Sequence, residues 1–188
     1  MSTWKNFWGH FRTVSRHRRY VRRGCFRVGL YYQGLTHDLS KYSPTEFLVG
    51  VRYYQGTRSP NNAEREAIGY STAWLHHQGR NKHHYEYWID YNPKGREPGE
   101  PTLVPVPMPD RYIAEMIMDR IAASKVYMGD AYTDASPLAY LMDRVERTPV
   151  HPETLAKLKH YLELLAEEGE EVAFRRIKEE LVKKKKSK

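Results

Sequence analysis

The opening segment constrains the fold most, because residues 4–33 contain no proline and repeat their apolar side chains at helical spacing. One row, at intervals of three or four residues, consists of Val14, His17, Val21, Cys25 and Val28. A neighbouring row of cations consists of Arg12, Arg16, Arg19, Arg23 and Arg27. Such spacing is typical of an amphipathic helix with one buried face. We therefore expect a long helix over residues 4–33 that contributes one face to the core.

Later segments carry signals that start helices. Ser43-Pro44-Thr45-Glu46 is a capping box with proline at the first helical position. Further helices are expected from Ser59-Pro60 to His77, from Asn81 to Tyr91, from Pro109 to about Gly129, from Ser136-Pro137, and from His151-Pro152 as a final pair separated at Gly169. Residues 92–109 contain six of the eleven prolines, which favours an extended excursion over the surface.

These signals predict an all-α fold with one domain of about seven helices over residues 1–182 and a basic tail at 183–188. The segment TLVPVPM has extended character, but its prolines argue against a central strand. Cys25 is the only cysteine, so the chain has no internal disulfide, as is usual in a reducing cytosol. Its place on the apolar row indicates a small core residue rather than a nucleophile.

Charge is distributed unevenly along the chain. Residues 1–30 carry +8 and residues 183–188 carry +5, which leaves −5 for residues 31–182 within a formal net charge of +8. Nucleic-acid-binding domains usually carry their cations on the folded surface, so this mildly acidic body argues against that class. The sequence contains neither an apolar run of about 20 residues nor a secretory signal. We expect a cytoplasmic protein with no membrane partner.

Four of the nine histidines lie in the stretch WLHHQGRNKHHYEYW, where they form the pairs His76-His77 and His83-His84. Two adjacent helical residues cannot both point equally well at one ion, so one member of each pair is expected to be a metal ligand. His77 and His83 are favoured because they lie nearest the turn between the two predicted helices. His76 and His84 are then expected to support the ligands or to lie on the surface.

Three other segments supply imidazole and carboxylate groups. His17 lies on the apolar row, where a lone histidine is more often a satisfied core residue than a ligand. His37 and Asp38 are adjacent and flanked by leucines, which indicates a partly buried setting. Asp119 lies on the apolar face of its predicted helix, where a carboxylate requires a metal or a cation such as an arginine of the first helix. Imidazole together with carboxylate suits Fe, Mn, Zn or Co better than Ca.

The order His17, His37-Asp38, Asp119 resembles the H…HD…D ligand order of the HD-domain metal-dependent phosphohydrolases. HDLSK is similar to the HDxGK variant of that family, with serine in place of glycine. THDLSKYSPTEF, GTRSPN, GYSTAWLHHQGRNKHHYEYWIDY and MDRIAASKVY further resemble a largely uncharacterised bacterial family of short HD-like proteins, over roughly residues 15–140. The short gap between the first two ligand positions and the HHxGRNxHH block depart from the best-known HD enzymes.

The resemblance implies an HD-like helical bundle that holds one or two divalent transition metals (Fe, Mn, Zn or Co). The implied ligands are His17, His37, Asp38, His77, His83 and Asp119, with Asp38 bridging a pair of ions. The cations expected to contact phosphate are Lys41, Arg80 and Lys82, with Arg120 as a further candidate. The implied activity is hydrolysis of a small phosphate ester, such as a nucleotide, with Asp38 in the catalytic group.

Two other functions fit the same sequence. Some HD-fold proteins hold a mixed-valent di-iron pair with four histidines and two aspartates and activate dioxygen, and this chain supplies that number. A non-enzymatic nucleic-acid-binding module is the third hypothesis, supported by the arginine row, the lysine tail and tyrosines that can stack on bases. RNA binding does not require His17 or Asp119 on an apolar face. Iron content, oxygen consumption and the salt dependence of RNA affinity separate these functions.

Overall fold

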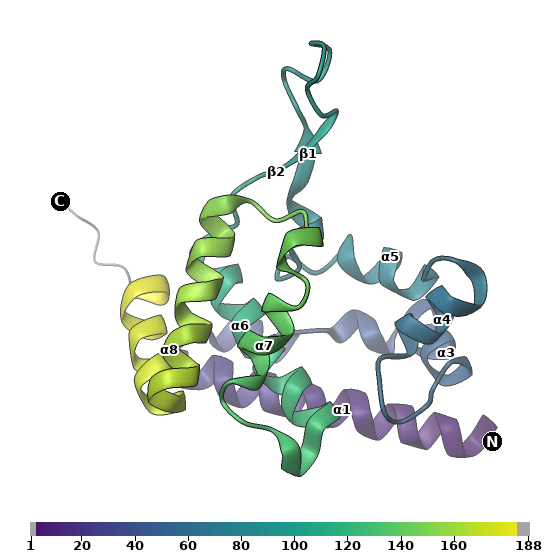
Figure 1. The fold of residues 1–188 in the computed structure, drawn as a ribbon. Helices are drawn as coiled ribbons and strands as arrows, with labels where there is room; N and C mark the ends of the chain where they lie inside the picture. The colour runs from purple at the N-terminus through teal and green to yellow at the C-terminus, as the bar shows by residue number, and fades with distance from the viewer. Residues whose placement is uncertain (1–2, 184–188) are drawn as a thin grey trace.

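A computed structural model of the protein describes residues 3–183, which are mostly helical (Figure 1). The α-helices are α1 (Thr3–Val28), α2 (Tyr31–Thr36), α3 (Pro44–Arg52), α4 (Pro60–Ile68), α5 (Thr72–Gln78), α6 (Asp110–Met128), α7 (Ser136–Met142) and α8 (Pro152–Ile177). The only sheet in this part of the chain pairs β1 (Ile89–Tyr91) with β2 (Leu103–Pro105). The expected predominance of helices is confirmed. Residues 184–188 of the predicted basic tail lie outside the described residues.

Short 3-10 and π segments connect these helices. The 3-10 helices are η1 (Leu39–Tyr42), η2 (Tyr85–Trp88), η3 (Gly129–Ala131) and η4 (Val145–Arg147), and one π-helical turn, η5 (Lys178–Val182), follows α8. The predicted helix start at Ser43 is confirmed, because the Ser43 side-chain oxygen accepts the Glu46 backbone N–H at 3.4 Å. The Glu46 carboxylate contacts His76 and His77 rather than completing a capping box. No helix within residues 3–183 is long and apolar enough to cross a bilayer.

The first helix buries its apolar row as predicted but is shorter than expected. Every member of the row from Val14 to Val28 is buried. The helix ends there because Gly29 has a φ of +89°, a left-handed conformation that glycine adopts without a steric penalty. The chain then turns and α2 packs back along α1. The prediction of a continuous helix to residue 33 was wrong for this reason.

The predicted helix from residue 60 to His77 is divided into α4 and α5. Gly69 has a φ of +87° and ends α4. Ser71 then starts α5, because its side chain accepts the Trp74 backbone N–H at 3.1 Å. His77 therefore lies at the end of a separate short helix, which packs against α3.

The predicted helix from Asn81 to Tyr91 was also wrong. This segment forms η2 and then β1, which pairs antiparallel with β2 so that Ile89 faces Pro105 and Tyr91 faces Leu103. Pairing with a distant segment outweighs the local capping signal at Asn81. The two strands and the proline-rich loop between them project from the helical body as an arm (Figure 1).

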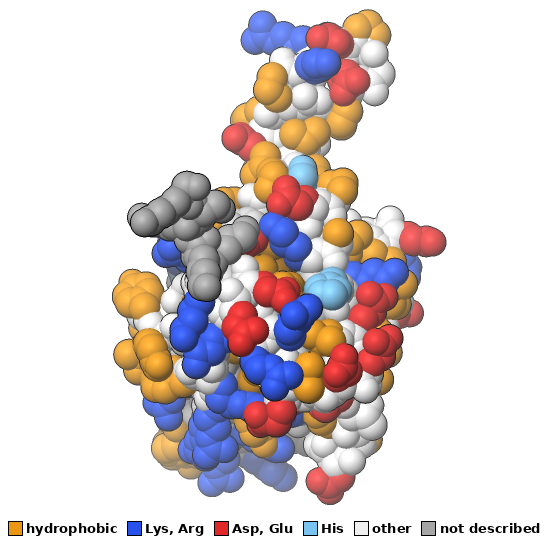
Figure 2. Space-filling view, turned by 90° about the vertical axis from the view of Figure 1, so that its left-hand side faces the viewer, with side chains coloured by type: hydrophobic (Ala, Val, Ile, Leu, Met, Phe, Trp, Pro, Cys, Tyr) orange, Lys and Arg blue, Asp and Glu red, His pale blue; other side chains and the backbone are white. Residues whose placement is uncertain are grey.

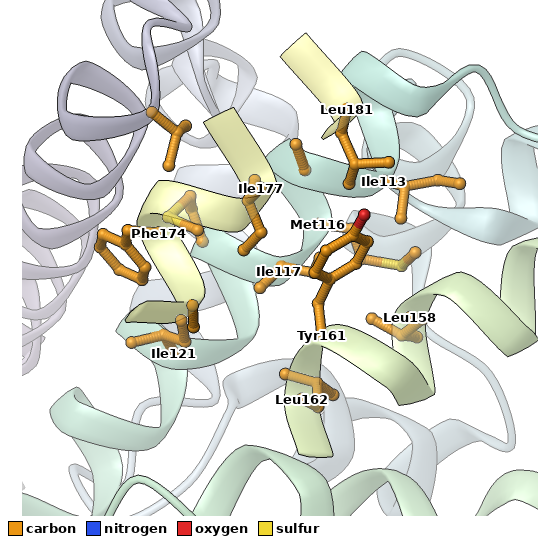
Figure 3. Close-up of a cluster of buried hydrophobic side chains, with 14 of the residues drawn as sticks. Ile113, Met116, Ile117, Ile121, Leu158, Tyr161, Leu162, Phe174, Ile177 and Leu181 are labelled. Carbon is orange, nitrogen blue, oxygen red and sulfur yellow. The ribbon is translucent and has the colours of Figure 1, made fainter. Parts of the chain in front are cut away.

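The hydrophobic core lies between α1, α6 and α8. Ile117 of α6, Leu162 of α8 and Ile177 at the end of α8 are fully buried (Figure 3). The predicted separation within the last helical pair occurs at Gly169, where φ is +78° and the chain folds back toward α6. α1 and α6 pack closely at Gly24, where an added Cβ atom would lie 2.7 Å from the Met118 sulfur. This closely packed pair of helices positions His17 and Asp119.

Candidate metal centre

Four separate segments bring imidazole and carboxylate groups together on one side of α1. His17 comes from α1 and Asp119 from α6, while His37 and Asp38 form the turn between α2 and η1. His77 ends α5, and His83 and His84 lie just before η2. Two groups of donor atoms share Asp38, a third consists of His37, His83 and Glu115, and within each group all donor atoms lie within 4.8 Å of one another.

Asp38 has an unusual backbone that places its side chain at the centre. Its φ is +53°, the only positive value at a non-glycine residue within the described chain. Aspartate is among the few residues that adopt this left-handed conformation at modest cost. Its side chain is fully buried. A strained residue that is buried and charged is a frequent feature of functional sites.

The first group surrounds one carboxylate oxygen of Asp38. Asp38 Oδ2 lies 3.3 Å from His37 Nε2 and 3.6 Å from His17 Nε2. Asp119 Oδ1 lies 2.9 Å from His17 Nε2 and 3.5 Å from His37 Nε2. Two imidazole nitrogens and two carboxylate oxygens therefore face a common point, a donor set that suits a first-row transition metal.

The second group surrounds the other oxygen of the same carboxylate. Asp38 Oδ1 lies 3.2 Å from His77 Nε2 and 3.3 Å from His83 Nε2. His84 Nε2 lies 2.9 Å from His77 Nε2 and completes the group. Because each oxygen of Asp38 belongs to a different group, this residue is positioned to bridge two ions.

Two buried glutamates hold the outer nitrogens of the imidazoles. Glu115 Oε1 lies 3.0 Å from His37 Nδ1 and 3.2 Å from His83 Nδ1. Glu46 Oε2 lies 2.7 Å from His77 Nδ1. A carboxylate that accepts the Nδ1–H leaves Nε2 as a lone pair directed at the centre, which is the arrangement that orients metal-binding histidines. Three of the five imidazoles are fixed in this way.

The inward-facing atoms lack partners that satisfy them. Despite the short contacts, His17 Nε2, His37 Nε2, His83 Nε2 and Asp38 Oδ1 are buried and form no hydrogen bond with any residue from 3 to 183. Buried polar atoms without a hydrogen-bond partner are costly. A divalent cation would satisfy all four atoms at once. The residues present therefore fit a metal.

The pKa values reflect the density of charge. Burial alone would raise the pKa of Asp38, but His37 and Lys41 outweigh it and hold that pKa well below its ordinary value. Burial would likewise lower the pKa of His37, but Asp38, Asp119 and Glu115 raise it well above its ordinary value. Metal binding at His37 must therefore displace a proton. Burial and the neighbouring His83 and His77 lower the pKa of His84, which favours the neutral imidazole that binds metals.

All six ligands expected from the sequence meet at this centre, but the sequence missed other members. His84 was expected to support the ligands or to lie on the surface because residues 81–91 were expected to be helical. The backbone at His84 is extended, with ψ near +132°. The angle between adjacent side chains in a helix therefore does not apply to His83 and His84. His76 stays outside and contacts Glu46 at 2.7 Å. Glu115 had a visible signal, because it lies one helical turn before Asp119.

A cavity of about 960 Å³ opens beside the metal-ligand cluster. His17, His84 and Asp119 contribute to its wall. The cations in its wall are Lys41, Arg58, Arg65, Arg120 and Arg144. The exposed Arg80 and Lys82 are not part of this wall. Arg80 instead donates to the His76 carbonyl, and Lys82 lies over the Tyr87 ring. The prediction that these two cations contact phosphate therefore has no support from their positions.

Replacing Glu115 by glutamine is expected to weaken metal binding by about 10- to 100-fold, the usual effect of losing such an orienting partner. Both imidazoles face the same oxygen, Oε1, and glutamine replaces its negative charge with a neutral amide oxygen, which is a weaker acceptor for both. Competition with a chromophoric chelator measures the affinity. Glu86→Gln is the matched control, because Glu86 is also largely buried but none of its contacts involves these histidines. Equal affinities for both variants would show that Glu115 has no orienting role.

Comparison with known proteins yields a family but no characterised relative. No curated protein and no solved structure matches the chain. A family model with the description "Family of unknown function (DUF5662)" matches residues 6–164. This range includes most of α1, all of α6 and every residue of the candidate metal centre. The chain therefore belongs to DUF5662, a family of unknown function.

Proposed function

We propose that this protein is a metal-dependent phosphohydrolase of the HD type that hydrolyses a small phosphate ester, such as a nucleotide. The observation that carries the proposal is the pair of donor groups sharing Asp38, with unsatisfied buried donor atoms, beside a cavity lined by cations. The spatial meeting of residues in the order H…HD…D supports the HD type.

The donor sets indicate which residues would hold each ion. His17, His37, Asp38 and Asp119 would hold one, and Asp38, His77, His83 and His84 would hold the other. When bound, divalent transition metals supply Lewis acidity, which makes water a competent nucleophile at neutral pH and polarises a phosphoryl group. In the hydrolysis, the water oxygen bonds to phosphorus, the ester P–O bond breaks, and the departing oxygen gains a proton.

Hydrolysis of a phosphate ester also requires cations that offset the charge of the phosphate, and the cations of the cavity wall suit this role. Arg120 Nε is buried and has no hydrogen-bond partner within the described chain, although it lies in the cavity wall with Asp119. Lys41 Nζ lies 2.5 Å from Asp38 Oδ2, so its charge is held next to the first donor group. Charge-assisted hydrogen bonds from such groups to phosphate oxygens are strong. The cavity volume also matches a ligand of nucleotide size.

Oxygen activation at a mixed-valent di-iron pair is a second candidate. The number of histidines in the centre favours it, because its five imidazoles exceed the four that such a centre requires and its two aspartates equal the required two. Imidazole is a good ligand for iron as well as for zinc. The identity of the bound metal and the reaction with dioxygen separate this candidate from hydrolysis.

The test begins with protein purified without a tag or chelator from cells supplied with Mn or Fe. Elemental analysis is expected to show at least one transition-metal equivalent per chain. The loaded protein is expected to hydrolyse p-nitrophenyl phosphate or one of a panel of nucleotides without consuming oxygen. Metal-free protein, or loaded protein inactive on every ester, would overturn the proposal. Oxygen consumption by an iron-loaded form would favour the second candidate.

Arg120→Ala is expected to raise KM for the hydrolysed ester by about 10- to 100-fold, the value of one or two hydrogen bonds between charged groups. Its metal content should not change, because Arg120 is not among the donor residues. Arg80→Ala is the matched control, since this exposed arginine lies outside the cavity wall. An equal KM for the two variants would show that Arg120 does not contact the substrate.

A further inference from the structure

The outward-facing surface of α1 forms a second charged region that the proposed hydrolysis does not use. The first acidic residue of the chain is Asp38, and the only other one before residue 53 is Glu46. Both side chains are buried within the metal centre. The exposed surface of α1, α2 and α3 therefore carries positive charges and no negative ones.

Most arginines on this surface have no acidic partner within the described chain. Arg12, Arg19, Arg22 and Arg23 are exposed and form no ion pair or hydrogen bond there. Arg27 differs, because it pairs with two glutamates of α8. Arg16, which is exposed and lies over the Tyr20 ring, links Arg12 to Arg19 at helical spacing, so these arginines form a continuous row without acidic partners in the described chain. Figure 2 shows Lys and Arg side chains gathered in the lower part of the molecule, where α1 lies in Figure 1.

Large apolar side chains border the arginine row at its beginning. Trp4, Trp8 and Phe11 follow one another at helical spacing and are 67%, 42% and 38% exposed. Their rings touch edge to face, with centroids 5.8 Å apart for each successive pair. The cluster is therefore an ordered aromatic surface that remains open to solvent.

Further apolar side chains border the row along its side. Leu35 on α2 and Leu39 on η1 are 56% and 51% exposed, and α2 packs along α1. Tyr31 is also exposed and contacts Phe26 of α1, with ring centroids 5.4 Å apart. Exposed leucines beside exposed aromatic rings and cations are unusual for a surface that faces only water. We define the arginine row and these apolar residues together as the α1 face.

We propose that the α1 face binds the surface of an anionic lipid bilayer. Arginines pair with lipid phosphates, and Trp and Tyr rings favour the depth of the headgroups. The exposed leucines favour a bilayer over a nucleic acid as the partner. Leu35 and Leu39 would bury apolar surface at the acyl boundary, whereas leucine side chains do not stack on bases. This is contact with one leaflet rather than a spanning segment, and it replaces the expectation of no membrane partner. His17 lies on the buried side of α1, so the proposal does not depend on the metal chemistry.

Sedimentation of the full chain with lipid vesicles tests the proposal. We expect binding to phosphatidylcholine vesicles that contain about one third phosphatidylglycerol, little binding to pure phosphatidylcholine, and weaker binding at higher salt. The combined variant Arg12→Gln/Arg19→Gln/Arg23→Gln is expected to lose roughly 100-fold in affinity for the anionic vesicles. A variant with Trp4→Ser and Trp8→Ser is also expected to bind more weakly, at unchanged charge.

The matched control removes three exposed cations from elsewhere, as Lys94→Gln/Arg96→Gln/Arg111→Gln. It is expected to keep most of the affinity, and an equal loss would overturn the proposal by showing an effect of net charge alone. Circular dichroism melting confirms that each variant folds, since exposed substitutions seldom change stability much. Polyuridylate binding is measured in parallel. Tighter binding to RNA than to anionic vesicles, or no binding to either vesicle type, would also overturn the proposal.

Discussion

Asp38→Asn is expected to empty both metal positions and to abolish hydrolysis, the largest effect expected of any single substitution. One oxygen of Asp38 faces His37 at 3.3 Å and the other faces His77 at 3.2 Å, so neither donor group is complete without the carboxylate. Asparagine keeps the size of the side chain and tolerates the left-handed backbone at this position, so the change removes charge with little change of shape.

Elemental analysis and thermal melting measure this effect together. A metal that binds only the native state stabilises it by about 2.7 kcal/mol at a hundredfold excess over Kd. Added metal should therefore raise the Tm of the wild type and leave that of Asp38→Asn unchanged. Asp119→Asn is the matched comparison, because Asp119 belongs only to the first donor group and its loss should spare the second ion. Wild-type metal content in Asp38→Asn would rule out a bridged centre.

The second large effect is an unequal contribution of the four clustered histidines to metal binding. Alanine at His77, His83 or His84 is expected to lower the metal content by about one equivalent, since each supplies a donor atom to the second group. Alanine at His76 is expected to leave the metal content intact, because that imidazole contacts only the outer carboxylate of Glu46. The sequence favoured only His77 and His83 as ligands, and the structure places His84 in the same donor group.

His160→Ala supplies the matched control for this series, because His160 is exposed on α8 and belongs to neither donor group. Hydrolysis is expected to fall in parallel with the metal content for the three ligand variants. Four small and equal effects would instead mean that the cluster is a surface patch. The reading with one ion held by His17, His37, Asp38 and Asp119 would then be the only one left.

Much of the helical framework was predictable because its signals are local. The Ser43 cap and the break at Gly169 depend on hydrogen bonds and backbone angles within a few residues. The apolar row of α1 likewise follows from the helical period, and it already placed His17 on the buried side. The same period indicated a buried carboxylate at Asp119. These are properties that neighbouring residues determine among themselves.

The end of α1 and the division between α4 and α5 were missed although glycine was visible at both places. Gly29 and Gly69 adopt positive φ values, whereas Gly24 and Gly50 lie inside helices. Glycine permits both conformations at similar cost, so the choice depends on what the flanking segments pack against. The arm shows the same limit, because β1 exists only through its pairing with β2 more than ten residues later.

The sequence by itself determined which residue types are available to the centre and that His17 and Asp119 face inward. Only the tertiary structure decided that the two oxygens of Asp38 face different donor groups, that His84 joins one of them, and that Glu115 supports two imidazoles. The physical reason is that the centre joins segments from α1 to α6, so its distances depend on how the helices pack. Helical period and capping act within one segment and carry no information about that packing.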